Sequence, residues 1–195
     1  MTTFISILLG VPLGIIASLI AWWILFHCIV PKIDFSEDIS KSETTDSASG
    51  YRYRIKFINT GKRDILDVEI FARFKVKGLR PNDPNTWSIA NLKVIQKRIP
   101  RIKTGTNKII RIRPETTELF FSIPYPSHIN DKYSNGILVL EDIMRLGNKN
   151  KLQLLIFGYD SFSGARKVFE SKIYDLRNVK SGLFKKGELI VDNII

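Results

Sequence analysis

The fold class is set by residues 51–76, which read YRYRIKFINTGKRDILDVEIFARFKV. Apolar and polar side chains alternate on both sides of the turn-forming tripeptide Asn59-Thr60-Gly61. Because successive side chains of a strand point to opposite faces of a sheet, this alternation predicts two half-buried antiparallel strands, at 51–57 and 66–76. The centre of the chain is therefore expected to lie in a β-sheet with one buried face.

The rest of the chain beyond residue 76 repeats this short-strand pattern. Strands are predicted at 108–113 and 119–123, and a hairpin is predicted to join 152–159 to 167–174 through Ser163-Gly164. Only 138–146 has a helical pattern, and prolines punctuate the strands. The sequence thus predicts an all-β immunoglobulin-like sandwich, and it lacks the helical repeats of an α/β nucleotide-binding fold.

The N-terminal segment has a different character. Residues 4–30 read FISILLGVPLGIIASLIAWWILFHCIV, and the first 31 residues contain no Lys, Arg, Asp or Glu. A helix needs about 20 apolar residues to cross the hydrocarbon core, so this run predicts one transmembrane helix. It has neither the basic start nor the cleavage site of a signal peptide, so we expect it to persist as an anchor. The predicted organisation is an anchor over 1–31, a polar juxtamembrane linker over 32–50 and a β-sandwich domain over 51–195.

Three residues near the end of the span are predicted to lie at the membrane interface: Trp22, Trp23 and Lys32. Lys32 and Lys41 follow the span closely, and no basic residue precedes it. The positive-inside bias therefore favours a cytosolic β domain on a single-pass protein of an inner or plasma membrane.

Small residues recur along the span at Gly10, Gly14 and Ser18. A four-residue spacing places them on one helix face, where neighbouring helices could approach closely. Small residues are also common in membrane helices in general, so self-association and simple lipid exposure both remain open.

The remainder of the chain is strongly basic, with a formal net charge of +11. Residues 93–113 hold eight basic side chains and no acidic one: Lys93, Lys97, Arg98, Arg101, Lys103, Lys108, Arg111 and Arg113. Such a surface attracts phosphates, on an anionic lipid or on a small phosphorylated ligand. Nucleic acid is a poorer fit because no aromatic residues interleave with these charges. The alternative is that exposed strands simply carry Lys and Arg on their solvent side.

The sequence contains few residues that could carry out catalysis. One Cys and two His exclude a multi-cysteine zinc site and leave little for a catalytic triad. Phosphate-loop, nucleophile-elbow and His-Glu-x-x-His motifs are missing from the sequence. We therefore expect no cofactor, no metal site and no enzymatic activity.

The order of these segments resembles the inner transmembrane helix and cytosolic immunoglobulin-like domain of inward-rectifier potassium channels. The resemblance rests on Pro31-Lys32 after the helix, on 56–63 (KFINTGKR) before an alternating strand, and on 152–158 before the Ser163-Gly164 hairpin. It extends to Tyr174, Val179, Gly182 and Phe184. It implies a cytosolic sandwich that assembles as a tetramer.

The chain departs from that family in two ways. It lacks the outer helix and the Thr-x-Gly-Tyr-Gly selectivity filter, so we do not expect it to be a potassium-selective channel by itself. Ile33 and Asp34 follow Lys32 where the family places several basic residues for a phosphoinositide headgroup.

Two functions remain open from the sequence. The first is a non-enzymatic membrane effector whose β domain senses a ligand or partner and oligomerises, with the helices forming a pore or perturbing the bilayer. The second is a membrane-tethered adaptor that recruits or regulates another membrane protein. A pair of leucine substitutions at Gly10 and Gly14 separates the two, because only the effector needs helix association.

Overall fold

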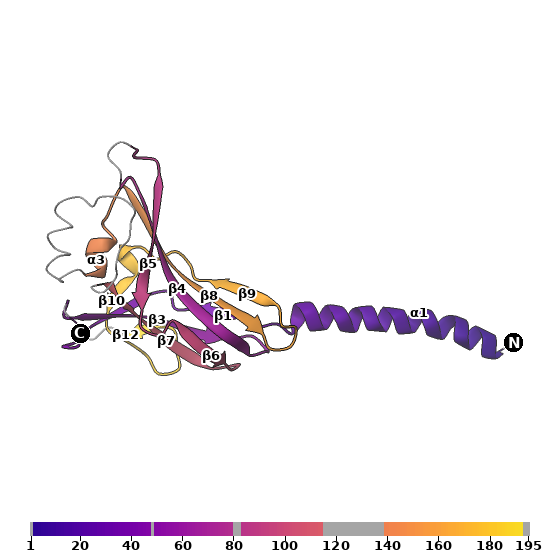
Figure 1. Ribbon diagram of the computed structural model, residues 1–195. Coiled ribbons are helices and arrows are strands. Elements are labelled where there is room, and N and C mark those ends of the chain that lie inside the picture. The colour runs from indigo at the N-terminus through magenta and orange to yellow at the C-terminus, as the bar shows by residue number, and fades with distance from the viewer. Residues whose placement is uncertain (1, 48, 80–82, 115–138, 193–195) are drawn as a thin grey trace.

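The computed structural model describes residues 2–47, 49–79, 83–114 and 139–192. A long N-terminal helix projects from one end of a β-rich domain, and the last described strand, β12 (Val191–Asp192), lies toward the opposite end of that domain (Figure 1). The helix α1 (Thr2–Trp23) continues directly into a π-helical segment, η1 (Ile24–Cys28). The window Gly10–Cys28 is long and apolar enough to cross a membrane, and it is not buried against the domain.

Over its described residues, the β domain has twelve strands and two short helical turns, one between β7 and β8 and one between β9 and β10. The strands are β1 (Ile33–Phe35), β2 (Ile39–Glu43), β3 (Tyr51–Asn59), β4 (Ile65–Lys77), β5 (Trp87–Val94), β6 (Arg98–Ile102), β7 (Asn107–Arg113), β8 (Lys149–Asp160), β9 (Arg166–Glu170), β10 (Val179–Ser181), β11 (Leu183–Phe184) and β12 (Val191–Asp192). The helical turns are α3 (Leu140–Ile143) and a 3₁₀ turn, η3 (Leu176–Asn178).

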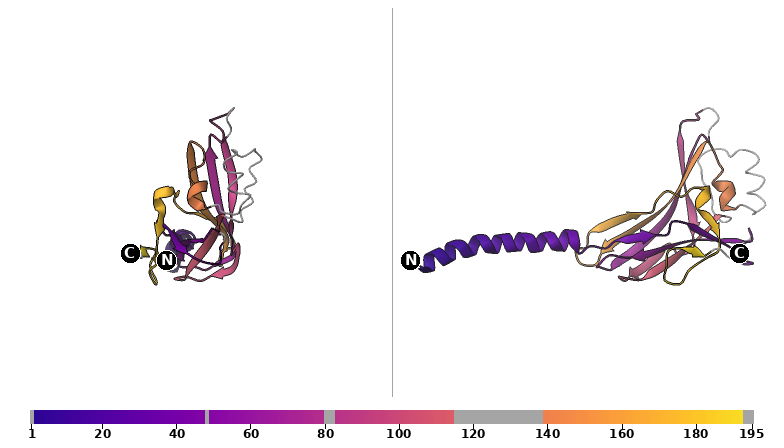
Figure 2. Two further views of the ribbon diagram at one scale, coloured as in Figure 1. Left: turned by 90° about the vertical axis from the view of Figure 1, so that its left-hand side faces the viewer. Right: turned by 180° about the vertical axis from the view of Figure 1, so that it is seen from behind.

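Ten of these strands form one curled sheet. The hydrogen-bonded order is β10-β2-β3-β7-β5-β4-β8-β9, with β1 added to β3 and β6 added to β4. Strand β5 connects the two halves, because it pairs with β4 along most of its length and with β7 only at Lys93 and Val94. Seen along the helix axis, the sheet curls around its own interior (Figure 2). The last two strands, β11 and β12, pair with each other.

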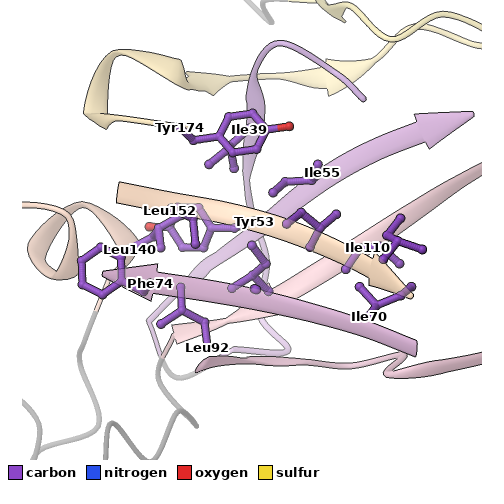
Figure 3. Close-up of a cluster of buried hydrophobic side chains, with 14 of the residues drawn as sticks. Ile39, Tyr53, Ile55, Ile70, Phe74, Leu92, Ile110, Leu140, Leu152 and Tyr174 are labelled. Atoms are coloured by element: carbon purple, nitrogen blue, oxygen red, sulfur yellow. The ribbon is translucent and has the colours of Figure 1, made fainter. Parts of the chain in front are cut away.

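The hydrophobic core fills the inside of this curl. Side chains alternate between buried and more exposed along most of β3 and β4, as the alternation in the sequence requires. Figure 3 shows Tyr53, Phe74, Ile110 and Leu152 converging on this interior from four different strands. Leu140 of α3 closes one end of the core and is fully buried.

The structure confirms the coarser expectation of a mainly β domain after one apolar N-terminal helix. The strands expected around 51–57, 66–76 and 108–113 are β3, β4 and β7, and the expected hairpin is β8–β9. A single helical turn, α3, lies inside 138–146. Strands β3 and β4 are not neighbours in the sheet. The strand expected at 119–123 falls outside the described residues.

The prediction of a polar linker over 32–50 is wrong for most of that segment. Strand β1 pairs with β3, and β2 lies between β3 and β10. Ile39 is fully buried, and the buried Ser40 hydroxyl donates a 2.5 Å hydrogen bond to the Gly182 carbonyl. The Tyr174 hydroxyl donates to the Ser36 carbonyl at 2.7 Å. The segment has the composition of a linker, but Ser36 and Ser40 make hydrogen bonds to backbone groups inside the domain.

Candidate functional site

The junction between the helix and the β domain is a tight backbone contact. The turn after β3 donates two hydrogen bonds to the Lys32 carbonyl, from the amides of Thr60 (2.9 Å) and Gly61 (3.1 Å). The amide of Lys62 donates to the Val30 carbonyl at 3.1 Å. A Cβ atom at Gly61 would overlap the backbone of residues 30–32, so only glycine allows this approach. The residues that follow the apolar helix are thus hydrogen-bonded to the β3–β4 turn.

Arg63 connects the helix end to a second turn of the domain. Its Nη2 donates a 2.7 Å hydrogen bond to the Leu25 carbonyl in η1, and its Nη1 lies 3.1 Å from Asp160 Oδ2 at the end of β8. The side chains of Arg63 and Asp160 are 8% and 2% exposed. Carbonyl groups in the last turn of a helix lack partners within the helix, and a cation is favourable there. Arg63 therefore satisfies the helix end and a buried carboxylate together.

The carboxylate of Asp160 is held ionised by its surroundings. Burial by itself would raise the pKa of this carboxyl, but hydrogen bonds from the Phe162 amide at 3.0 Å and from Arg63 outweigh burial and lower the pKa. The Ser163 hydroxyl also donates to it at 3.0 Å. The charged form is thus the one that closes the β8–β9 turn.

An exposed aromatic ring completes the junction. The Arg63 guanidinium lies 4.2 Å from the centroid of the Phe162 ring, yet Phe162 is 61% exposed. Trp22 and Trp23 near the helix end are also exposed, and Trp23 stacks on His27 with ring centroids 5.4 Å apart. The amphipathic rings of tryptophan favour the headgroup level of a bilayer. The β8–β9 turn lies beside the end of the apolar helix, so Phe162 belongs to the same end of the domain (Figure 1).

The other helix residues singled out by the sequence are placed as follows. Lys32 is exposed and lies 3.2 Å from Asp34. A Cβ atom added at Gly10 or Gly14 would meet no other atom within 4 Å, and the Ser18 hydroxyl donates to the Gly14 carbonyl at 2.8 Å. Ala17 and Ala21 share their helix face within an arc of about 100°. This face is therefore wider than the three predicted residues.

The eight basic residues of 93–113 do not form one patch. Arg98 and Arg101 on β6 are paired with Glu69 and Asp64 of the neighbouring strand or its turn, through hydrogen bonds of 2.7 Å and 2.6 Å. Lys97 lies 5.2 Å from the centroid of the Phe71 ring. The other five belong to a different part of the sheet or to turns.

Those remaining residues divide between two strands and one turn. Lys93 lies opposite Arg113 where β5 meets β7, and Arg111 lies opposite Arg54 of β3. The pKa of Arg54 is lowered by burial and by the neighbouring arginines Arg52 and Arg111. Lys108 is opposite Phe57 in β3, and Lys103 belongs to the turn between β6 and β7. The curl of the sheet thus separates charges that are close in sequence.

A second polar group, with largely covered side chains, lies at the far end of the domain. Glu141 of α3 accepts a 2.5 Å hydrogen bond from Lys41 of β2 and another of 2.5 Å from the Tyr53 hydroxyl. Burial raises the pKa of Glu141, but the hydrogen bonds from Lys41 and Tyr53 outweigh it, so the pKa is lowered. The pKa of Tyr53 is raised, first by burial and then by Glu141. Because both oxygens of Glu141 are occupied, this group fixes α3 to the sheet and is not a free base.

A pocket of about 620 Å³ lies next to this group. It is lined by Lys41, Ser42, Glu43, Tyr51, Arg54, Ser181, Gly182 and Leu183. The Lys41 ammonium lies 3.8 Å from the Tyr51 ring centroid, and its charge is paired with Glu141, so the pocket wall is partly neutralised. Within the described ranges, no group of three or more His, Cys, Asp or Glu side chains could hold a metal ion.

Sequence reasoning missed Arg63, Asp160 and Glu141. Arg63 stands in a Lys62-Arg63-Asp64 turn that resembles an ordinary solvated loop, and its partners are 38 and 97 residues away. The local sequence around Asp160 indicates only a bond within its own turn, which it also makes. A single sequence offers no signal for such distant pairing, since it depends on which turns the curled sheet brings together.

Comparison with known proteins adds little to this picture. No family model matches the chain, and no curated protein matches it, so no family match supports the resemblance to inward-rectifier channels. Among solved structures the chain is similar to the crystal structure of Spo0M, a sporulation control protein from Bacillus subtilis. The identity is 12%, the TM-score is 0.35, and the match covers 75% of this chain and 49% of that chain. The matched region thus spans about half the length of Spo0M, and this distant likeness carries no functional argument.

Proposed function

We propose that this chain is a non-enzymatic single-pass membrane protein with a cytosolic β domain that senses a ligand or partner and assembles into a small oligomer, with a tetramer favoured. Association along Gly10, Gly14 and Ser18 brings the membrane segments together, and the assembled helices form a pore or perturb the bilayer. The protein acts without a cofactor, in an inner or plasma membrane.

The observation that carries this proposal is the pair of bonds made by Arg63, to Leu25 in the helix end and to Asp160 in the sheet. A domain attached through a loose tether could change shape without moving its anchor. Here the helix end is held to two turns of the domain, so a rotation of the domain would be passed to the membrane segment. This is the coupling that a sensor with a membrane output needs.

Charge at the junction supports the cytosolic side. Lys32 follows the span directly, and Lys62 lies at the same level because its amide bonds to the Val30 carbonyl. Lys41 contributes less than its position in the sequence suggests, since it is bound to Glu141 inside the domain. Basic groups close to the end of a span favour retention on the cytosolic side.

The test is the mass of the detergent-solubilised full-length protein, measured by light scattering with the detergent subtracted. A tetramer is expected for the natural chain, and a monomer for the double variant Gly10→Leu, Gly14→Leu. The matched control is Ile16→Ala, Leu19→Ala, which changes side-chain volume on the opposite helix face and should leave the mass unchanged.

An unchanged mass in the leucine variant would contradict association of the helices along Gly10, Gly14 and Ser18. A monomeric natural chain would favour the adaptor, in which the anchored domain recruits or regulates another membrane protein. Either result would leave the junction around Arg63 in place, since that contact lies within one chain.

A further inference from the structure

The outer face of β4, β5 and β8 carries five cations in a compact grid. Residues directly opposite in an antiparallel pair share a face, so the register defines three rows across β5, β4 and β8. The rows are Trp87, Lys77 and Lys149; Ile89, Lys75 and Lys151; and Asn91, Arg73 and Gln153. None of these nine positions holds an acidic residue.

Two of the rows place like charges directly opposite each other. Lys75 faces Lys151, and Lys77 faces Lys149. Such pairs are destabilising in an antiparallel sheet. Within the part of the chain that the structure describes, no carboxylate is in ion-pair contact with any of the five cations. Glu170 approaches the grid only through the side-chain amide of Gln153, at 3.1 Å.

In the described part of the chain, nearby arginines, unlike these five cations, are paired with carboxylates. At the other end of β4, Arg98 is neutralised by Glu69 and Arg101 by Asp64. Among the described residues, the two ends of β4 therefore differ: cations of the neighbouring β6 are paired with carboxylates at one end, whereas the cations at the other end have no such pairs. A bound anion would relieve the repulsion between Lys75 and Lys151.

The grid is hollowed into a pocket with an aromatic side. The pocket has a volume of about 340 Å³ and is lined by Arg73, Lys75, Trp87, Ile89, Lys151, Gln153 and Ile173. Its volume lies at the lower end of the range of small-molecule sites. Trp87 is 38% exposed, and Lys151 Nζ lies 5.2 Å from the centroid of its ring. The site combines an exposed aromatic ring with three cationic side chains.

We propose that this pocket binds a nucleotide with two or more phosphate groups, and that this is the ligand of the sensing role proposed above, on which this step rests. The base of the nucleotide lies over β5 against Trp87 and Ile89. Its phosphates lie over Arg73, Lys75 and Lys151. Neighbouring strands are about 4.8 Å apart, so cations on β4 and β8 can bridge adjacent phosphates. The limited volume favours such a small ligand over a long nucleic-acid strand.

The experiment uses the full chain in nanodiscs of phosphatidylcholine, which offers no anionic lipid to compete. The probes are ATP, inorganic tripolyphosphate and adenosine, titrated by calorimetry. We expect ATP to bind about tenfold tighter than tripolyphosphate, because base stacking on Trp87 adds to the phosphate contacts. We expect adenosine to show no binding, since it lacks phosphates.

Three variants locate the site. Lys75→Gln should weaken ATP binding by about tenfold or more while the melting temperature stays the same or rises, because the variant also removes the repulsion with Lys151. Trp87→Ala should reduce the affinity for ATP to that for tripolyphosphate. The matched control is Lys103→Gln, which removes one charge from the β6–β7 turn and should bind ATP as the natural chain does.

Other outcomes would overturn the proposal. They are no ATP binding at millimolar concentration, an equal loss in Lys75→Gln and Lys103→Gln, or binding of a single-stranded DNA of about 20 nucleotides without binding of ATP. The last would assign the face to nucleic acid. Mass and ligand binding are measured separately, so a tetramer that ignores ATP rejects only the ligand, and a monomer that binds ATP rejects only the assembly.

Discussion

Arg63 Nη2 lies 2.7 Å from the carbonyl oxygen of Leu25, so a side chain from the β3–β4 turn binds the C-terminal end of the apolar helix. The same guanidinium bonds to Asp160 at the end of β8. Two turns that are 97 residues apart in the chain are therefore held against one helix end. The stability of this junction should depend on each of these groups in a measurable way.

Replacing Arg63 by Met should lower the free energy of unfolding by about 3 kcal/mol, because it leaves a buried carboxylate without its partner. The measurement is denaturant unfolding in detergent, followed by circular dichroism. The control is Arg101→Met, which breaks a more exposed pair with Asp64 and should cost less than about 1 kcal/mol. Equal losses in the two variants would contradict a buried junction.

Acid should destabilise the domain through Asp160. The folded pKa of this carboxyl is lowered, so its stabilising contribution is fully present above the unfolded pKa of about 4 and is lost as the pH falls through the folded pKa. The free energy of unfolding should therefore decrease with falling pH below about 4. Asp160→Asn should make that decrease shallower, with part of it retained because the pKa of Glu141 is lowered as well. A slope identical to that of the natural chain would argue against this assignment.

Gly61→Val should loosen the contact between the helix end and the domain, because a side chain there overlaps the backbone of residues 30–32. Hydrogen exchange should become faster at the amides of Thr60 and Lys62, which bond to that backbone. Thr60→Val places the same branched side chain at an exposed position one residue earlier and serves as the control. Unchanged exchange in Gly61→Val would show that the contact is not required.

Glu141→Gln should lower the free energy of unfolding by about 2 kcal/mol, because Lys41 loses its charged partner in a largely buried place. The same denaturant experiment measures this change. The control is Lys180→Gln, which breaks a more exposed ion pair with Asp38 and should cost less than about 1 kcal/mol. A loss in Glu141→Gln no larger than in the control would mean that α3 is not fixed by this group.

Local patterns predicted the elements that are long and regular. The alternation of Tyr53, Ile55 and Phe57 with basic residues indicated β3 and its buried face, and a similar alternation indicated β4. The apolar run of the N-terminus was sufficient to predict a helix that could cross a membrane. Both features, a two-residue alternation and the length of an apolar run, can be read directly along the chain.

Short and polar elements could not be predicted in this way. Strands β1 and β2 have the composition of a linker, and they become strands only because β3 and β10 are available to pair with them. The register between strands also left no trace in the local sequence. It decides that Lys75 faces Lys151 and that Arg98 lies beside Glu69.

The sequence by itself thus determined an apolar helix, a mainly β domain and an excess of positive charge. Only the tertiary structure decided which charges are neutralised, which are gathered in a pocket around Trp87 and which residue ties the helix to the sheet. The physical reason is the range of the interactions. Strand periodicity is a property of neighbouring residues, whereas ion pairs and pockets depend on segments that a curled sheet brings together from distant parts of the chain.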